Sequence, residues 1–199
     1  MDAPAGARIV DVLVGAGFEP GGGAVPVRAR RLRSLADTVG PGMRLLVCGL
    51  NPSIYSADVG VGYARPGNRF WPAAVEAGLV SRDRDPAHAL DVHGVGITDL
   101  VKRATRTAAE VRPEEYGAGL ARVKRLAAWL RPGAVCFVGL AGWRAAVDRR
   151  AVAGVQRGGI GGVPAYVMPS TSGVNASSTR AVLVEHLRAA AACADGATS

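Results

Sequence analysis

Lysine, cysteine and aromatic side chains are scarce in this chain of 199 residues. Its three cysteines, Cys48, Cys136 and Cys193, lie far apart, and no Cys-x-x-Cys pair occurs. A zinc site or an iron–sulfur cluster is therefore not expected, and we predict neither a metal nor a cofactor. An odd number of widely spaced thiols, two of them inside apolar runs, fits a reducing, cytosolic compartment.

Long apolar runs are also missing. No stretch approaches the roughly 20 apolar residues that cross a bilayer, so we expect no membrane partner. Residues 1–20 lack the basic start and apolar stretch of a secretory signal. The strong preference for Arg over Lys, together with abundant Ala and Gly, indicates a GC-rich genome. We therefore expect a cytoplasmic, bacterial protein, with a monomer as the default state.

Basic side chains are in excess, with a formal net charge of +8 and a pI of about 10.2. Lys102 and Lys124 are the only lysines, and every other basic residue is Arg. Such an excess is what binding to a phosphate backbone requires, although a lineage that favours Arg would also produce it. The basic run at 28–33 could touch DNA, but a solvated helix face is the commoner outcome for such a run.

The composition suits a single folded domain. Hydrophobic residues make up 49% of the chain and charged residues 20%, too few for a disordered chain. We predict a flexible N-terminal extension over residues 1–26, with a possible short helix at 8–14. The domain itself is expected over residues 27–192, and a disordered tail over 193–199.

Short apolar runs alternate with helical patterns along the domain. We predict buried strands at 45–50, 134–139 and 164–168, a turn and short strand at 91–100, and helices at 68–78, 113–130, 143–147 and 179–192. Residues 51–67 are expected to form a long loop and 154–162 a glycine-rich connection. Such alternation predicts an α/β sandwich around a mostly parallel sheet, with its site in the loops that begin at Asn51, Gly139 and Pro169.

Three motifs fall in these loops. The first is Gly49-Leu-Asn-Pro-Ser53, followed by Tyr63-Ala64 and Pro66-Gly-Asn-Arg-Phe-Trp71. The second runs from Gly96 to Val101, with Arg103 and Thr105 after it, and the third is Met168-Pro-Ser-Thr-Ser-Gly-Val-Asn175. In order and spacing they resemble the mismatch-specific uracil/thymine-DNA glycosylases of the uracil-DNA glycosylase superfamily. The resemblance covers about residues 34–190 and implies that family's three-layer α/β/α fold.

The resemblance implies a reaction on a base swung out of the DNA duplex into a pocket. It assigns to Asn51 the task of holding the attacking water through the side-chain carbonyl, because an amide is no general base. Tyr63 corresponds to an aromatic that stacks on the flipped base. Backbone N–H groups near Leu50 and Tyr63 are expected to bind the base oxygens, and Ser56 and Gly60 to shape the pocket.

The third motif resembles the loop that fills the gap left by the flipped base. Ser170 and Ser172 are expected to bind flanking phosphates. Gly173 and Val174 align with the wedge, and Asn175 with a contact to the partner base. An ordinary loop between a strand and a helix is the alternative for this segment.

Some residues depart from the family pattern or remain open. Ser53 stands where the family usually carries Gly, and Val174 is smaller than the common wedge residues. Arg69 is assigned mainly to packing, with a phosphate contact as the alternative. Asp58 and Asp99 are acidic residues near the expected site, but a solvated loop position is favoured for Asp58, and the sequence shows no convincing pair of catalytic carboxylates.

We therefore predict a monofunctional glycosylase that excises uracil, thymine or a related damaged base from mismatched double-stranded DNA. Neither lysine lies in a motif, which argues against Schiff-base chemistry. A glycosylase of the same fold for hypoxanthine, xanthine or ethenocytosine remains an alternative, as does a non-catalytic DNA-binding module. A nucleotide-binding α/β protein is disfavoured because no Gly-x-Gly-x-x-Gly or Walker sequence occurs.

Overall fold

The computed structural model describes residues 5–21, 28–174 and 178–196. Its core is a five-stranded sheet in the order β4-β3-β5-β7-β6, in which only β6 runs antiparallel. The sheet strands are β3 (Leu45–Gly49), β4 (Val95–Asp99), β5 (Ala134–Val138), β6 (Gly154–Ile160) and β7 (Val163–Met168). The predicted mostly parallel sheet is confirmed.

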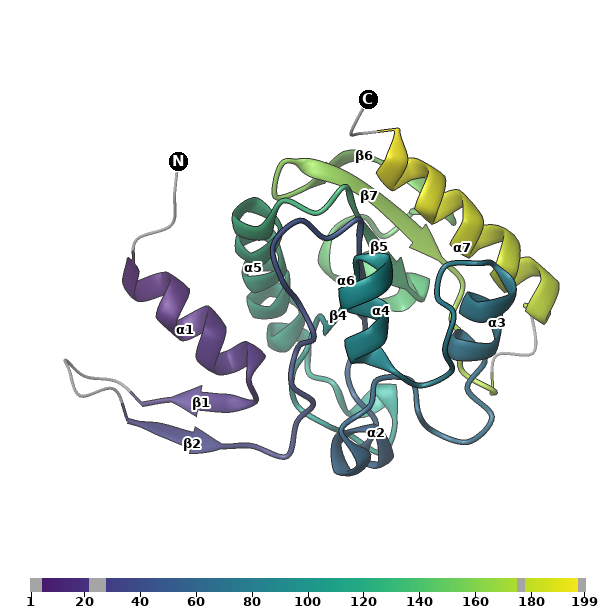
Figure 1. Cartoon of the computed structure of the whole chain (residues 1–199). Coiled ribbons are helices and arrows are strands. Elements are labelled where there is room, and N and C mark those ends of the chain that lie inside the picture. The colour runs from purple at the N-terminus through teal and green to yellow at the C-terminus, as the bar shows by residue number, and fades with distance from the viewer. Residues whose placement is uncertain (1–4, 22–27, 175–177, 197–199) are drawn as a thin grey trace.

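Helices cover both faces of this sheet (Figure 1). One face carries α3 (Phe70–Glu76), α4 (Pro86–His93) and α7 (Arg180–Asp195), and the other carries α5 (Pro113–Leu130) and α6 (Leu140–Ala146). Strands β3, β4 and β5 are buried along their whole length, which explains the continuous apolar runs of β3 and β5. The predicted three-layer α/β/α sandwich is thus confirmed.

Local sequence signals account for several boundaries. Pro113 begins α5, where its missing N–H costs nothing, and two glutamates occupy the first turn. The Thr179 side chain caps α7 by accepting a hydrogen bond from the Val182 N–H. Helix α7 continues to Asp195, whereas the sequence predicts its end at Ala192, and Asp195 forms an ion pair with Arg44 at 2.6 Å.

Three expectations about local structure are wrong, and one helix is absent from the predictions. The connection at 154–162 contains strand β6, an edge strand whose mixed exposure hides the usual apolar run. The predicted loop at 51–67 contains helix α2 (Ile54–Val59), which has six residues and is too short to show a helical period. Helix α4 was not predicted, and the basic run at 28–33 contains strand β2 (Ala29–Arg31) rather than a helix face.

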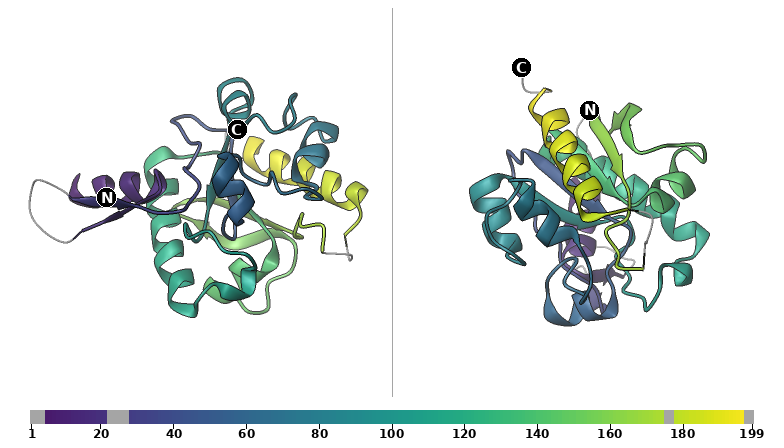
Figure 2. Two further views of the ribbon diagram at one scale, coloured as in Figure 1. Left: turned by 90° about the horizontal axis from the view of Figure 1, so that it is seen from below. Right: turned by 90° about the vertical axis from the view of Figure 1, so that its right-hand side faces the viewer.

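The N-terminal elements stand beside the sandwich (Figure 2). Helix α1 (Ala5–Gly15) is followed by the antiparallel pair β1 (Phe18–Pro20) and β2, and η1 (Ala108–Glu110) is a short turn of 3₁₀ helix before α5. Asp11 of α1 is buried and receives two hydrogen bonds from Arg125 of α5, at 2.7 and 2.8 Å. Helix α1 is therefore joined to the sandwich through α5.

Within the described ranges, no helix combines the length and the apolar character needed to cross a membrane.

Candidate functional site

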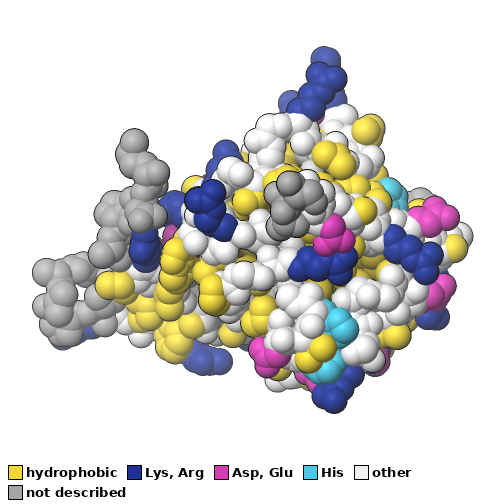
Figure 3. Space-filling view, turned by 45° about the horizontal axis from the view of Figure 1, so that its top comes forward, with side chains coloured by type: hydrophobic (Ala, Val, Ile, Leu, Met, Phe, Trp, Pro, Cys, Tyr) yellow, Lys and Arg dark blue, Asp and Glu magenta, His cyan; other side chains and the backbone are white. Residues whose placement is uncertain are grey.

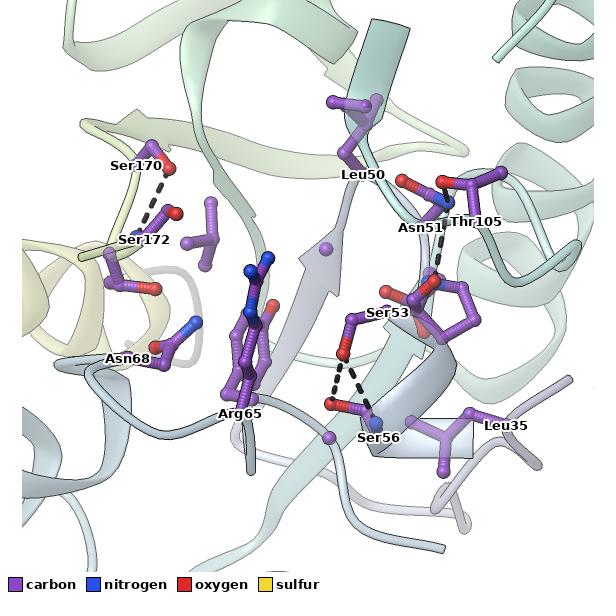
Figure 4. A pocket seen from close by; sticks show the side chains of 18 of the residues that line it. Leu35, Leu50, Asn51, Ser53, Ser56, Arg65, Asn68, Thr105, Ser170 and Ser172 are labelled. Carbon is purple, nitrogen blue, oxygen red and sulfur yellow. Dashed lines mark hydrogen bonds between the residues drawn. The ribbon is translucent and has the colours of Figure 1, made fainter. Parts of the chain in front are cut away.

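A cavity of about 440 Å³ opens at the carboxyl ends of β3, β4 and β5 (Figure 4). The parallel strands bring together five segments that are distant in the sequence, as expected for the site of a parallel α/β sheet. Its lining consists of Leu35, Gly49, Leu50, Asn51, Pro52, Ser53, Ser56, Gly62, Tyr63, Arg65, Asn68, Ile97, Asp99, Thr105, Arg106, Thr107, Ala108, Val138, Ser170, Thr171, Ser172 and Val174.

The side-chain amide of Asn51 is held in one orientation. Its Nδ2 donates to Thr105 Oγ1 at 2.7 Å and to the Arg103 carbonyl at 3.1 Å, and lies 3.3 Å from the Pro52 carbonyl. Carbonyl oxygens only accept hydrogen bonds, so the nitrogen of the amide must face them. In Figure 4 the Asn51 nitrogen is turned toward Thr105 and its Oδ1 lies on the other side of the amide. Oδ1 is thereby presented as an acceptor.

Thr105 connects the second motif to the first. Its backbone N–H donates to the Pro52 carbonyl and its own carbonyl accepts from the Ile54 N–H, both at 3.2 Å. Its hydroxyl donates to the Thr107 carbonyl at 2.7 Å, which leaves the Thr105 oxygen to accept from Asn51. The sequence motif contains Thr105, but no role is predicted for it.

Arg103, the next anchor of Asn51, is itself fixed. Its guanidinium donates to both carboxylate oxygens of Glu115, at 2.8 and 2.7 Å, and to the Glu110 carbonyl. The side-chain hydrogen bond from Arg103 is the largest contribution that lowers the pKa of Glu115 to about 2. Helix α5 therefore supports the backbone carbonyl that holds Asn51.

Ser53 and Ser56 organise α2 at the cavity wall. Ser53 Oγ accepts from the Ser56 N–H at 3.1 Å as the helix N-cap and donates to Ser56 Oγ at 3.1 Å. The Ser53 side chain thus has a structural role at a position where the resemblance implies Gly. Gly60 does not line the cavity. It ends α2 in the left-handed conformation, with φ of +73°, where glycine carries no steric penalty.

Tyr63 lies across the cavity in a strained conformation, with φ of +59°. Its ring stacks on Phe70, with centroids 4.2 Å apart. Trp71 supports the same turn by donating from Nε1 to the Gly62 carbonyl at 2.7 Å. The Tyr63 hydroxyl is buried without a hydrogen-bond partner among the described residues, and burial raises its pKa well above the usual value.

The two acids considered near the motifs have different environments. Asp58 is exposed on α2 and pairs with Arg33 at 2.5 and 2.8 Å; hydrogen bonding to Arg33 lowers the Asp58 pKa. Asp99 is only 6% exposed and lines the cavity. Burial raises the pKa of Asp99 to about 6, although the positive charges of Lys102 and Arg122 oppose the shift.

Lys102 belongs to a buried polar cluster behind β4. Its Nζ donates to the Leu35 carbonyl and to Asp37 Oδ1, the latter at 2.6 Å. Arg122 donates to Asp37 Oδ2 at 2.7 Å and to the carbonyl of Asp99 at 2.8 Å. Lys102 is absent from the cavity lining, and its Nζ is engaged by Asp37 and the Leu35 carbonyl, so it is poorly placed to act as a nucleophile.

The third motif closes the remaining side of the cavity. Ser170, Ser172 and Val174 all line it, and Val174 is 87% exposed at its mouth. Gly173 lies outside the lining, but a Cβ there would stand 2.7 Å from the Gly67 carbonyl, so only glycine allows this approach of the two loops. Asn175 lies outside the described residues.

Arg69 ties the first motif to the third. Its side chain donates to the carbonyls of Ser172 (at 3.0 Å) and Ser178, and its backbone N–H donates to the Thr171 carbonyl at 2.9 Å. Asn68 lies just before the Arg69 N-cap of α3, and its Oδ1 accepts from the Phe70 N–H at 2.9 Å. Arg69 packs between the two motifs as favoured for it, whereas the N-cap position expected for Asn68 is occupied by Arg69.

The structure thus places seven of the ten predicted site residues in one cavity: Leu50, Asn51, Ser56, Tyr63, Ser170, Ser172 and Val174. Leu35, Arg65 and Arg106 also line it but carry no sequence signal, because only the tertiary fold brings them there.

A comparison with protein families agrees with this geometry. Residues 36–191, most of the chain, match the family described as the Uracil DNA glycosylase superfamily. The matched range begins just after the N-terminal elements and includes the five-stranded sheet and all three motifs. Because the matched range covers most of the chain and agrees with the observed fold and cavity, the chain belongs to the Uracil DNA glycosylase superfamily.

Proposed function

We propose that the protein is a monofunctional DNA glycosylase that flips uracil, thymine or a related base out of mismatched double-stranded DNA and removes it by hydrolysis. Superfamily membership supports DNA glycosylase chemistry in general. The observation that carries the proposal is the fixed amide of Asn51, whose Nδ2 is engaged by Thr105 and Arg103 while Oδ1 remains available.

In the proposed reaction, Asn51 Oδ1 accepts a hydrogen bond from a water molecule and aligns it with the anomeric carbon of the sugar. The C–N glycosidic bond breaks, with its electron pair leaving on the base, and the water oxygen bonds to the cationic sugar carbon. The water proton passes to solvent because an amide cannot take it. The products are the free base and an abasic site.

Departure of the base is the second requirement. The ring of Tyr63, supported by Phe70, offers a stacking surface worth about 1–3 kcal/mol per base. Backbone N–H groups of Leu50 and Tyr63 are the proposed donors to the base oxygens as negative charge develops there. Because Asn51 supplies no charge to the sugar cation, we expect slow chemistry that depends on positioning.

The third motif is the proposed contact with the opened duplex. Ser170 and Ser172 are proposed to bind phosphates beside the flipped nucleotide, and Val174 to enter the gap in the stack. The exposure of Val174 at the cavity mouth supports this assignment. Because Val174 is short, we expect incomplete filling of the gap.

A panel of labelled duplexes tests the proposal. Uracil, thymine, hypoxanthine or ethenocytosine is placed opposite each normal base, and alkali then cleaves abasic products. We expect strand breaks that depend on alkali for uracil in a mismatch. Borohydride should trap no covalent enzyme–DNA adduct, because Lys102 is held by Asp37. Failure of every duplex to yield an abasic product would contradict the proposal and favour a DNA-binding module.

A further inference from the structure

Two short strands that precede the matched range form an arm beside the cavity. The antiparallel pair β1 and β2, extended by the hydrogen bond from the Gly21 N–H to the Arg28 carbonyl at 2.7 Å, is called the N-terminal ribbon below. It ends before residue 36, where the family match begins. Every residue of β2 is exposed, so packing in the core does not explain the sequence of this strand.

The N-terminal ribbon is rich in arginine. It carries three arginines, Arg28, Arg30 and Arg31, and only one acid, for a net charge of +2. The acid, Glu19, forms an ion pair with Arg30 at 2.6 Å. The Arg31 guanidinium lies over the Phe18 ring, 5.5 Å from its centroid, which leaves its edge N–H groups open. Among the described residues, the Arg28 side chain has no ion pair and no hydrogen bond. Two of the three guanidinium groups can therefore bind an anion.

The base of the ribbon is fixed to the wall of the cavity. The Arg33 carbonyl accepts a hydrogen bond from the Ala104 N–H at 3.3 Å, and the Arg33 side chain binds both carboxylate oxygens of Asp58 on α2. Two residues further along the chain, Leu35 is buried and lines the cavity. The ribbon therefore projects from a segment that the sandwich holds in place.

The position of the ribbon suits a duplex that lies across the cavity. In Figures 1 and 2 the ribbon and the loop of the third motif lie on opposite sides of α2, at the end of the sheet where the cavity opens. From Leu35, the chain reaches at most about 14 Å to Arg31 and about 25 Å to Arg28. Because a duplex rises about 3.4 Å per base pair, these lengths correspond to about four and seven base pairs.

We propose that the N-terminal ribbon is a second DNA-binding element, in which Arg28 and Arg31 bind backbone phosphates on one arm of the duplex. The contacted phosphates lie at most about seven base pairs from the flipped base. A guanidinium donates two parallel N–H bonds to a phosphate, which positions the duplex without reading its sequence. This inference rests on the proposed glycosylase function, and it assigns to the ribbon a part in affinity but none in breaking the glycosidic bond.

The first test is the salt dependence of duplex binding, measured by fluorescence anisotropy. A 2′-fluorine on the mismatched uridine destabilises the sugar cation and so keeps the duplex intact. Each phosphate contact adds about 0.9 to the slope of log affinity against log salt, so Arg28→Gln with Arg31→Gln should lower this slope by about 1.8. Between about 50 and 200 mM salt, the affinity of this double variant should fall about tenfold less than that of wild type. Arg28→Lys with Arg31→Lys keeps both charges and should keep the wild-type slope.

A pair of asymmetric duplexes tests on which side the contact lies. Each places the mismatched uridine about three base pairs from one end and about eleven from the other, with the long arm on its 5′ side in one duplex and on its 3′ side in the other. Because the ribbon lies on one side of the cavity, wild type should bind one duplex at least about fivefold more tightly than the other at low salt. The double Gln variant should bind both equally.

A matched control removes the same two positive charges elsewhere. Lys124 and Arg131 are exposed near the end of α5 that leads into β5, at the edge of the sheet opposite the cavity, and neither lines the cavity. Lys124→Gln with Arg131→Gln should keep the wild-type slope and the preference between the two duplexes. With enzyme in saturating excess, both double Gln variants should excise uracil at the wild-type single-turnover rate, since the ribbon takes no part in the chemical step.

The possible failures can be told apart. Basic side chains on an exposed strand also discourage pairing with other strands, and a role confined to that protection would leave DNA binding unchanged. A ribbon variant with the slope of the control, or equal binding of the two asymmetric duplexes by wild type, would overturn the inference while leaving the glycosylase function standing. Absence of excision by wild type would instead contradict the proposed function.

Discussion

At the scale of single residues, the site depends on hydrogen bonds that orient uncharged groups. Asn51 is held by a hydroxyl and by backbone carbonyls, and Thr105 is oriented in turn by the Thr107 carbonyl. The sequence motif predicts Asn51 as the central residue. It does not predict its anchors, because Thr105 lies more than fifty residues away and only the pairing of β3 with β4 brings the two motifs together.

Replacing Thr105 by Val tests this orientation. The change removes one acceptor for Asn51 Nδ2 but leaves the Arg103 carbonyl, so the loss should correspond to one hydrogen bond, about 0.5–1.5 kcal/mol. We expect the single-turnover rate to fall by roughly 2- to 10-fold, with duplex affinity unchanged. Thr105→Ser keeps the hydroxyl and should restore most of the rate. Equal losses in the two variants would show that the hydroxyl is not what matters.

The buried hydroxyl of Tyr63 gives a second prediction. It has no hydrogen-bond partner among the described residues, so Tyr63→Phe removes an uncompensated polar group and keeps the stack on Phe70. We expect the free energy of unfolding to stay constant or rise by up to about 1 kcal/mol in urea denaturation. Tyr63→Leu, which loses the stacked ring, should instead be destabilised. A destabilised Phe variant would mean that the hydroxyl is satisfied in solution.

At the scale of elements, the cavity is formed by loops that only the fold brings into contact. The buried strands β3, β5 and β7 were predictable because each is a short apolar run between turn residues. Helix α2 was not predictable from its interior, because the six residues between Ser53 and Gly60 are too few to show a helical period. Its ends do carry signals, since Ser53 is a good N-cap and Gly60 is a good C-terminal residue. The end signals of this helix were therefore more informative than its interior.

The contact between the first and third motifs can be tested at Gly173. Gly173→Ala would place a Cβ 2.7 Å from the Gly67 carbonyl and force the two loops apart. We expect weaker duplex binding and at least a threefold slower excision, about 0.7 kcal/mol of barrier. Gly117→Ala is the matched control, because its Cβ would meet nothing within 4 Å in the interior of α5, where Ala favours the helix by up to about 1 kcal/mol. Normal binding and excision by Gly173→Ala would contradict the assignment of this loop.

The Arg103–Glu115 pair predicts how acid affects the support of Asn51. The folded pKa of Glu115, about 2, lies below its usual value of 4.5, so the pair stabilises the fold above about pH 4.5 and this contribution is lost as pH falls toward 2. Because the Arg103 side chain is partly exposed, we expect Glu115→Gln to cost only about 1–2 kcal/mol at pH 7. Urea denaturation of both proteins at pH 7 and pH 3 measures this. If the free energies of unfolding of the two proteins differed by the same amount at pH 7 and pH 3, this prediction would be contradicted.

At the scale of the whole molecule, fold and family agree over residues 36–191, while the N-terminal elements lie before the matched range. The sequence could predict the layered architecture because α/β alternation leaves few packing solutions. It could not predict how α1 sits, because the buried contact of Asp11 with Arg125 joins positions 114 residues apart. Long-range ion pairs of this kind leave no periodic signal.

The excess positive charge has a testable consequence for the whole molecule. The face in Figure 3 carries scattered basic side chains with acidic ones among them, rather than one continuous basic patch. With a net charge of +8 overall, duplex affinity should still fall by at least about tenfold between 50 and 200 mM salt, as phosphate contacts release counterions. Fluorescence anisotropy with a labelled duplex measures the slope. An affinity independent of salt would exclude phosphate binding as the main source of affinity.

The most direct test of the account is the rate of uracil excision by Asn51→Ala under single-turnover conditions. We predict a rate at least tenfold below wild type, about 1.4 kcal/mol or more of barrier, with duplex affinity and melting temperature unchanged. That result would identify Asn51 with the chemical step. Wild-type excision by this variant would contradict the account at its centre, because the fixed amide would then have no part in the reaction.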